Sequence, residues 1–136
     1  MADTELLFTF NPRDPRYKGA LRIIEELRGK LYVPDVALLE FEIVLKSRGK
    51  SQDEIKQALL ALKRIFTNYD IKEVNTVNTI MLINHLELMT DYGLSYFDSL
   101  IASATLLVDG VIVSDDPAFD KVEGLRRIPI SARLDC

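Results

Sequence analysis

The residues of this sequence that could do chemistry are acidic. Asp3 lies near the N-terminus, Glu40 and Asp98 lie in apolar segments with helical spacing, and Asp115-Asp116 follows an apolar run typical of a buried strand. Carboxylates are almost never fully buried without a partner, because an unpaired charge is strongly disfavoured away from water. We therefore take these acidic residues as the candidate functional residues of the chain.

Each acidic position also has an ordinary structural explanation. Asp98 follows Ser95, a predicted helix N-cap, and a carboxylate in the first turn of a helix stabilises the helix dipole. Glu40 lies in a segment too apolar for a surface helix, but Glu42 is equally acidic, and periodicity does not decide which of the two points inward. Asp115-Asp116 precedes a proline and is also typical of a loop turn. The local pattern leaves these alternatives open.

The sequence lacks the residues that several common chemistries need. His85 is the only histidine, which excludes mechanisms that use two imidazoles. Cys136 is the only cysteine, which excludes an intrachain disulfide and a cysteine-based zinc site. Motifs for dinucleotide binding, P-loops, serine hydrolases and zincins are absent from the sequence. Any chemistry must therefore use carboxylates, hydroxyls, lysine or arginine.

Length and composition predict a single domain over residues 1–136. The chain is 48% hydrophobic and 28% charged, so it can bury a core. No apolar run approaches the ~20 residues that cross a bilayer, and no basic segment precedes an apolar one at the N-terminus. We therefore expect a cytoplasmic protein with no membrane contact. The net charge of −4 excludes a large basic field for binding duplex DNA without sequence preference.

Hydrophobic periodicity predicts helices that alternate with strands, bounded by glycine, proline and capping residues such as the pair Ser51 and Glu54. By composition, Leu6 to Phe10 also reads as a strand. This alternation is typical of an α/β domain with a parallel sheet, whose functional crevice lies beyond the carboxyl ends of the strands. The predicted helices cover 17–27, 35–48, 52–66, 75–92 and 95–110, with a short turn near 119, and the predicted strands cover 31–33, 69–74, 111–114 and 127–130.

Four segments, in this order, resemble the motifs of a PIN domain, the metal-dependent nuclease domain of VapC-type toxins and many archaeal proteins. Each motif alone is short, but four of them at compatible spacing make a specific pattern, and the likeness spans nearly the whole chain. The segments are Asp3-Thr4, Pro34 to Glu40, Asp98 to Ala102 and Ser114 to Phe119.

The resemblance implies a three-layer α/β/α fold with a parallel five-stranded sheet in the order 3-2-1-4-5. In that fold the segment after Asp3 forms a loop and a helical turn, which revises the strand expected from the composition of Leu6 to Phe10. Only Met1 and Ala2 precede Asp3. The first strand is therefore expected to be very short, unless the native start lies upstream of Met1.

The resemblance also implies a metal site. The family's fourth acidic residue lies three positions before a phenylalanine, which selects Asp116 over Asp115, and the family's helix pattern selects Glu40 over Glu42. Such a group of carboxylates suits one or two Mg²⁺ or Mn²⁺ ions and the hydrolysis of phosphodiester bonds in single-stranded RNA. The implied catalytic and metal-binding residues are Asp3, Glu40, Asp98 and Asp116, with Thr4 and Ser114 as hydroxyls that orient the carboxylates.

An acidic protein that cuts RNA needs local positive charge near its site. Two basic groups are candidate patches for phosphate: one follows the first motif and supplies the possible RNA contacts, and the other lies at the end of the predicted helix that carries Glu40. Family resemblance further implies an antitoxin protein as a partner and a homodimer. The first basic group is Arg13, Arg16 and Lys18, and the second is Lys46, Arg48 and Lys50.

Three functions compete for this sequence. The leading one is a metal-dependent endoribonuclease, acting either as a toxin or as an RNA-processing factor. A catalytically silent scaffold of the same fold, which binds RNA or protein, is the alternative, although all four acidic residues are present. A receiver-like phosphoacceptor domain needs an aspartate at the end of a middle strand with a lysine on a late loop near it, and Tyr69 to Val74 offers no such arrangement.

Overall fold

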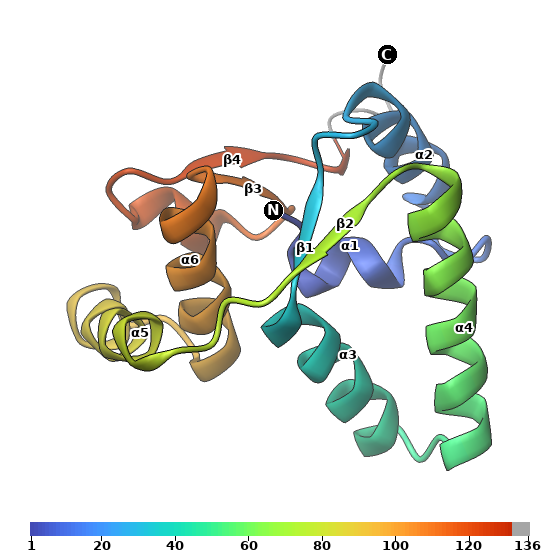
Figure 1. Cartoon of the computed structure of the whole chain (residues 1–136), viewed down its shortest axis with the longest axis horizontal. Helices are drawn as coiled ribbons and strands as arrows, with labels where there is room; N and C mark the ends of the chain where they lie inside the picture. The colour runs from blue at the N-terminus through green and yellow to red at the C-terminus, as the bar shows by residue number, and fades with distance from the viewer. Residues whose placement is uncertain (132–136) are drawn as a thin grey trace.

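The structure is a computed structural model that describes residues 1–131. Helices and short strands alternate along the chain (Figure 1). The elements are α1 Thr4–Phe8, α2 Tyr17–Glu26, β1 Tyr32–Pro34, α3 Asp35–Ser47, α4 Gln52–Asn68, β2 Lys72–Val74, α5 Thr79–Tyr92, α6 Tyr96–Val108, β3 Val111–Val113, the 3-10 helix η1 Pro117–Lys121 and β4 Arg126–Ile128.

The segment after Asp3 is helical. Composition alone predicts a strand over Leu6 to Phe10, and that prediction is wrong, whereas the helical turn implied by the family resemblance is confirmed as α1. Leu6 and Leu7 are both buried, and consecutive buried residues in a short apolar run fit either a strand or a helix. Tertiary contacts, including those between α1 and α3, decide between the two.

Helix α5 begins three to four residues later than predicted. The pair at 75–76 reads as a helix start, but Asp35 at the beginning of α3 accepts hydrogen bonds from the Thr76 amide at 3.0 Å and the Thr76 hydroxyl at 2.5 Å. Asn78 instead caps the helix, because its side chain accepts a hydrogen bond from the Met81 amide at 2.9 Å. A long-range contact therefore displaces a local capping signal.

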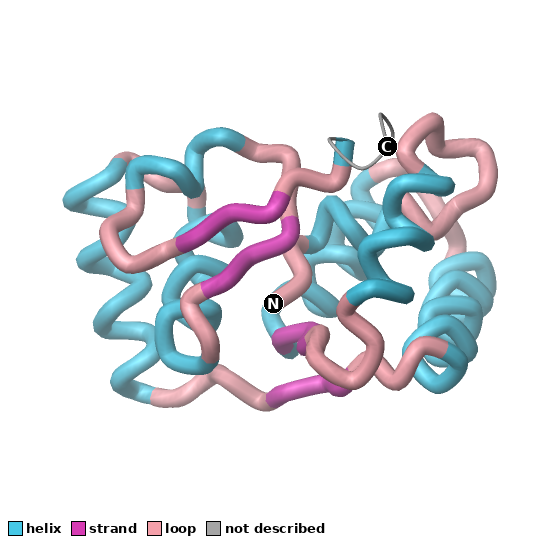
Figure 2. Tube along the Cα trace, turned by 90° about the horizontal axis from the view of Figure 1, so that it is seen from above, coloured by secondary structure: helices cyan, strands magenta, loops and turns pink. Residues whose placement is uncertain are grey.

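The N-terminal segment joins two separate pairs of parallel strands, β1 with β2 and β3 with β4. The Ala2 amide donates to the Tyr32 carbonyl at 2.8 Å, while the Val113 amide donates to the Met1 carbonyl at 2.8 Å. Five chain segments thus lie side by side in the order β2, β1, N-terminal segment, β3, β4, as Figure 2 shows. This is the order 3-2-1-4-5, but residues 1–131 contain four strands rather than five, because the first segment makes only one isolated bridge.

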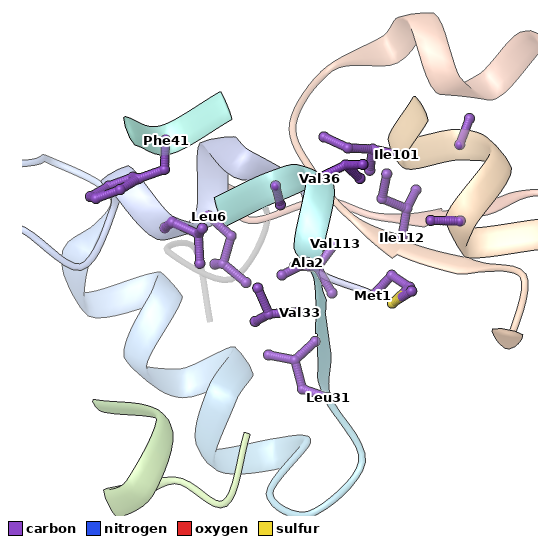
Figure 3. Close-up of a cluster of buried hydrophobic side chains, with 14 of the residues drawn as sticks. Met1, Ala2, Leu6, Leu31, Val33, Val36, Phe41, Ile101, Ile112 and Val113 are labelled. Carbon is purple, nitrogen blue, oxygen red and sulfur yellow. The ribbon is translucent and has the colours of Figure 1, made fainter. Parts of the chain in front are cut away.

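The core lies around this central segment. Met1 and Ala2 pack among residues of β1, α3, α6 and β3 (Figure 3). Helix α3 is less buried than expected, because Leu39 and Ile43 leave 52% and 51% of their surface exposed. The interpretation of this segment as too apolar for a surface helix is therefore wrong: α3 buries one side and exposes apolar residues on another. Among the described residues, no helix is both long and apolar enough to cross a membrane.

Candidate active site

A cleft of about 660 Å³ brings together four acidic residues from four distant parts of the chain. Asp3 comes directly before α1, Glu40 from the middle of α3, Asp98 from the first turn of α6, and Asp116 from the loop after β3. Asp3 is buried, with 5% of its surface exposed, and the other three are half-buried. The structure thus gathers every acidic residue that the sequence singled out for the site.

The sheet explains why the first and last of these residues meet. The N-terminal segment and β3 are parallel neighbours, so the residues that follow them leave the sheet at the same edge. Ser114 Oγ donates a hydrogen bond to Asp3 Oδ2 at 2.6 Å and accepts one from the Asp116 amide at 3.0 Å. One hydroxyl therefore fixes the position of both segments.

Asp115 and Asp116 have different surroundings although they are adjacent. Asp116 lines the cleft and caps η1, because its Oδ1 accepts a hydrogen bond from the Ala118 amide at 2.9 Å. Asp115 instead holds the chain near residue 131: its Oδ1 accepts from the Ile130 and Ser131 amides at 2.7 and 2.9 Å. The geometry agrees with the choice of Asp116 as the residue that faces the cleft.

Glu40 and Glu42 also face different parts of the surface. Glu40 lines the acidic cleft, while Glu42 lines a different groove between α3 and α4. Asp98 combines both of its possible roles, since it lies in the first turn of α6 and lines the cleft. Its amide donates to Ser95 Oγ at 3.3 Å, so Ser95 is the N-cap, as predicted.

The carboxylates of the cleft repel one another, and this repulsion adds to the effect of burial on their pKa values. The pKa of Asp3 is raised to about 7, mainly by burial and further by the charges of Asp98, Glu5 and Glu40, while the hydrogen bond from Ser114 acts in the opposite direction. Burial and the charge of Asp98 also raise the pKa of Glu40. Burial, then the charges of Asp116 and Glu5, raise the pKa of Asp98. A bound cation would favour the charged form of these carboxylates and so counteract the rise in their pKa values.

Two hydroxyls lie beside the carboxylates, and they differ. Ser114 donates to Asp3, as the orienting role predicts. The buried Thr4 hydroxyl faces Glu40 and lowers the pKa of that carboxyl as a hydrogen-bond donor would, offsetting part of its rise. Thr4 Oγ1 nevertheless meets the full distance and angle requirements of a hydrogen bond with none of the described residues. A buried hydroxyl without a partner is costly, and here it lines the acidic cleft.

The donor set suits a hard cation, because it consists of carboxylate oxygens and Mg²⁺ keeps several water ligands of its own. The unpartnered Thr4 hydroxyl and the raised carboxyl pKa values fit the same interpretation. Within residues 1–131, however, no three histidine, cysteine, aspartate or glutamate side chains are arranged so that they could hold an ion together. Water ligands or side-chain movement would have to complete the coordination.

The basic residues near the cleft fall into two kinds. Arg13 lines the cleft and is exposed, whereas Lys18 is exposed but is not among the lining residues. Arg16 lines the cleft, but its guanidinium forms ion pairs with Glu5, with Asp14 at 3.3 Å and with Asp115 at 3.3 Å. Its charge is therefore directed at carboxylates of the protein, which argues against Arg16 as a free RNA contact.

Several residues that line the cleft were not singled out as site residues from the sequence, Glu5 and Phe8 among them. Glu5 is a further acidic residue of the cleft, two positions after Asp3, and Phe8 follows one turn later on α1. Arg48 also lines the cleft, and it belongs to the second basic group that the sequence offered as a candidate patch. Its spacing of eight residues from Glu40 was the available signal, because residues at multiples of four share a helix face.

Comparison with known proteins agrees with this architecture. The sequence matches the family model of the PIN domain over residues 1–125. A chain in the crystal structure of VapBC2 from Rickettsia felis bound to a DNA fragment from their promoter has a similar fold, with a TM-score of 0.73 and 15% identity, covering 95% of this chain and 96% of that one. A chain of the DNA-bound VapBC structure from Salmonella typhimurium gives a TM-score of 0.69 and 14% identity, covering 96% of each chain.

These likenesses, at such low identity, show the fold alone. No curated protein matches the sequence. The PIN-like α/β fold and the resemblance carried by the four motifs are nevertheless confirmed, because the family match spans most of the chain and includes all four acidic residues. The chain belongs to the PIN domain family.

Proposed function

We propose that this protein is a metal-dependent endoribonuclease that hydrolyses phosphodiester bonds of single-stranded RNA in the acidic cleft. PIN domains are generally nucleases, so the general class follows from the family. The observation that carries the proposal is the convergence of Asp3, Glu40, Asp98 and Asp116 on one cleft from four segments. Structural stability does not require four carboxylates to be gathered where three of them have raised pKa values.

The four carboxylates would hold Mg²⁺ or Mn²⁺. Such an ion lowers the pKa of a bound water and offsets charge on the phosphate oxygens, and a second ion would do the same on the other side. Within the chain, Ser114 holds Asp3 by Oδ2, and no residue in 1–131 donates a hydrogen bond to Asp3 Oδ1. Oδ1 is therefore the oxygen of Asp3 that is available to a ligand in the cleft.

Ion pairs within the protein neutralise some of the negative charge at the edge of the cleft. Arg16 pairs with Glu5 and Asp115, so two carboxylates at the edge of the cleft are neutralised from within the protein. Asp3, Glu40, Asp98 and Asp116 have no ion pair among residues 1–131. The negative charge that remains available is thus concentrated on the four proposed ligands.

Cleavage of a labelled single-stranded RNA by purified protein tests this proposal. We expect cleavage with Mg²⁺ or Mn²⁺, loss of cleavage with EDTA, and loss in Asp98→Asn, which keeps the shape of the side chain but removes its charge. Glu42→Gln is the matched control on α3, because Glu42 lies outside the acidic cleft. Equal cleavage by wild type and Asp98→Asn would reveal a contaminating nuclease and contradict the proposal.

A catalytically silent scaffold that binds RNA or protein remains the alternative function. It predicts binding without cleavage for the wild type at any divalent ion concentration. The four acidic residues and their shared cleft favour the enzyme, because a scaffold needs no such group. A toxin and an RNA-processing factor share the reaction and differ in the RNA that they cut.

We also propose an antitoxin as partner, as the VapBC assemblies with the same fold suggest. A groove between α1, α3 and α4, whose lining includes the exposed Ala61 and the half-buried Leu45 and Ile65, offers a surface for it. Co-expression with the product of a neighbouring small gene, followed by copurification, tests this partner. A neighbouring gene whose product never copurifies would favour the RNA-processing role.

A homodimer is the remaining proposal about assembly. Ile80, Ile83 and Leu86 on α5 leave 64%, 50% and 57% of their surface exposed, and they recur at helical spacing. A second copy of the chain would remove this apolar stripe from water. Light scattering during size-exclusion chromatography should give the mass of two chains for the wild type and of one chain for Ile83→Lys.

A further inference from the structure

Two arginines and a phenylalanine line the same cleft as the acidic residues. Phe8, Arg13 and Arg48 line the same cleft as Asp3 and Glu40. The guanidinium carbon of Arg48 lies 4.9 Å from the centre of the Phe8 ring, which is the geometry of a cation–π contact. Phe8 packs in turn against Phe41, with ring centres 4.7 Å apart. The Arg48 guanidinium therefore lies on the ring of Phe8, which itself packs against Phe41 of the core.

The charge of this group is available, unlike that of Arg16. Arg48 and Arg13 are exposed, and neither forms an ion pair with any residue in 1–131. Arg16, by contrast, pairs with Glu5, with Asp14 and with Asp115. Among the cleft arginines of the described chain, Arg13 and Arg48 are thus the cations that can meet an external anion.

Helix α3, whose C-terminal cap is Arg48, sets the distance between the acidic Glu40 and the basic Arg48. Glu40, Val44 and Arg48 follow one another every four residues and all line the cleft. At a rise of 1.5 Å per residue, Glu40 and Arg48 are separated by about 12 Å along the helix axis. At a stacking distance of ~3.4 Å, this span matches roughly three nucleotides. Arg48 would consequently meet a nucleotide that flanks the bond to be cut.

We propose that Arg48, stacked on Phe8, together with Arg13, forms a binding site for a flanking nucleotide of single-stranded RNA. This inference rests on the proposed endoribonuclease function and assigns the residues that hold its substrate. A base would stack on the open face of the Arg48 guanidinium, since guanidinium planes stack on unpaired bases, and Arg13 would contact a phosphate. A nucleotide offers both the flat ring and the negative charge that this arrangement fits, whereas an acidic peptide offers only the charge.

Binding without metal isolates this site from the acidic residues. We would measure the anisotropy of a fluorescent single-stranded RNA with wild-type protein in EDTA, where the carboxylates repel phosphate and the arginines supply the attraction. Arg48→Ala should weaken binding roughly 5- to 150-fold, the range for loss of one stacked base. Arg13→Ala removes the proposed phosphate contact, so this variant should lower the slope of log affinity against log salt by about 0.7.

Lys46→Ala is the matched control, because it removes the same charge from α3 at an exposed position that does not line the cleft. We expect less than a twofold effect for this variant. Arg48→Lys keeps the charge and removes the planar group, so it should keep the salt slope of the wild type but bind more weakly. With 2-aminopurine in the RNA, binding should change the fluorescence for the wild type and Lys46→Ala, and much less for Arg48→Lys.

Equal weakening by Arg48→Ala and Lys46→Ala would overturn the assignment, because it would mean general charge attraction without a built site. Unchanged binding by Arg48→Ala would overturn it as well, and so would a finding that Arg48→Ala disrupts only a complex with a protein partner. Failure of the proposed function gives a different result: the wild type would then bind RNA through Arg48 but never cut it.

Discussion

Ser114 donates a 2.6 Å hydrogen bond to Asp3 across a separation of 111 residues, and this contact connects the two chain segments that carry Asp3 and Asp116 at the sheet edge. Both residues are buried, so the bond is shielded from water. The same hydroxyl accepts the amide of Asp116 at 3.0 Å. The position of two proposed metal ligands therefore depends on one side chain that binds no metal itself.

We expect Ser114→Ala to lower the free energy of unfolding by roughly 1–3 kcal/mol, because it removes the hydrogen-bond partner of a buried carboxylate and of a partly buried amide. The effect should be larger at pH 8 than at pH 5, since the Ser114 hydrogen bond lowers the pKa of Asp3 and so favours its charged form. Urea unfolding at the two pH values measures this. A loss of the same size at both would mean that Ser114 does not act through the charge of Asp3.

Thr4→Val should have the opposite effect on stability without metal. Thr4 Oγ1 is buried and has no hydrogen-bond partner among the described residues, so an apolar group of the same shape removes a desolvation cost. We expect the free energy of unfolding to stay equal or rise by up to about 1 kcal/mol, and the affinity for Mn²⁺ to fall. Thermal melts and Mn²⁺ titration test the two parts; a marked destabilisation would show that Thr4 has an essential partner.

The pKa of Asp3, about 7 in the folded protein against 3.8 for the ordinary side chain, makes stability depend on pH. The folded state keeps a proton that the unfolded chain has released between about pH 4 and 7, so the free energy of unfolding falls as pH rises through that range. Below pH 3.8 both states are protonated, and the effect vanishes.

Asp3→Asn removes this titration. Without metal, the free energy of unfolding of the variant relative to that of the wild type should therefore rise by a few kcal/mol between pH 4 and pH 8. Each unit of difference in pKa corresponds to about 1.4 kcal/mol. Denaturant unfolding of both proteins across this range measures the difference. A constant difference between the two would contradict a raised pKa for Asp3.

Asp115 and Asp116 should respond in opposite ways to the same substitution. Asp116→Asn should abolish cleavage with little change in stability, because Oδ1 of asparagine still accepts the Ala118 amide. Asp115→Asn should lower the free energy of unfolding by roughly 1–3 kcal/mol, since Asp115 carries the ion pair with Arg16 and accepts amides near residue 131. Activity per folded molecule should remain. Loss of cleavage in both variants without unfolding would contradict the separation of the two roles.

Metal should reverse the stability order of wild type and Asp98→Asn. Without metal the variant should melt higher, because burial and nearby carboxylates raise the pKa of Asp98 and so disfavour its charge. Metal at about 100 times its dissociation constant adds roughly 2.7 kcal/mol to the wild type and less to the variant. One kcal/mol corresponds to roughly 2–8 °C in Tm. A variant that melts lower without metal, with equal shifts in both proteins, would make Asp98 a structural helix residue only.

Local elements were largely predictable from the sequence, because their signals are local. The capping box of Ser51 and Glu54 is present as predicted, and Gly93 ends α5 with a φ of 66°, a conformation that favours glycine. Signals failed where distant residues compete for the same groups. Asp35 binds Thr76 and delays α5, and the first segment is too short to count as a strand although it lies between β1 and β3.

The sequence by itself determined which residue types were available: carboxylates rather than histidines or cysteines, in four motifs whose order indicates the family. Only the tertiary structure decided how each charge is used. Arg13, Arg16 and Arg48 are alike in sequence, yet Arg16 pairs with carboxylates of the protein while Arg48 lies exposed over Phe8. The physical reason is that charge interactions depend on distance and burial, and residues 99 or 111 positions apart acquire both only when the chain folds.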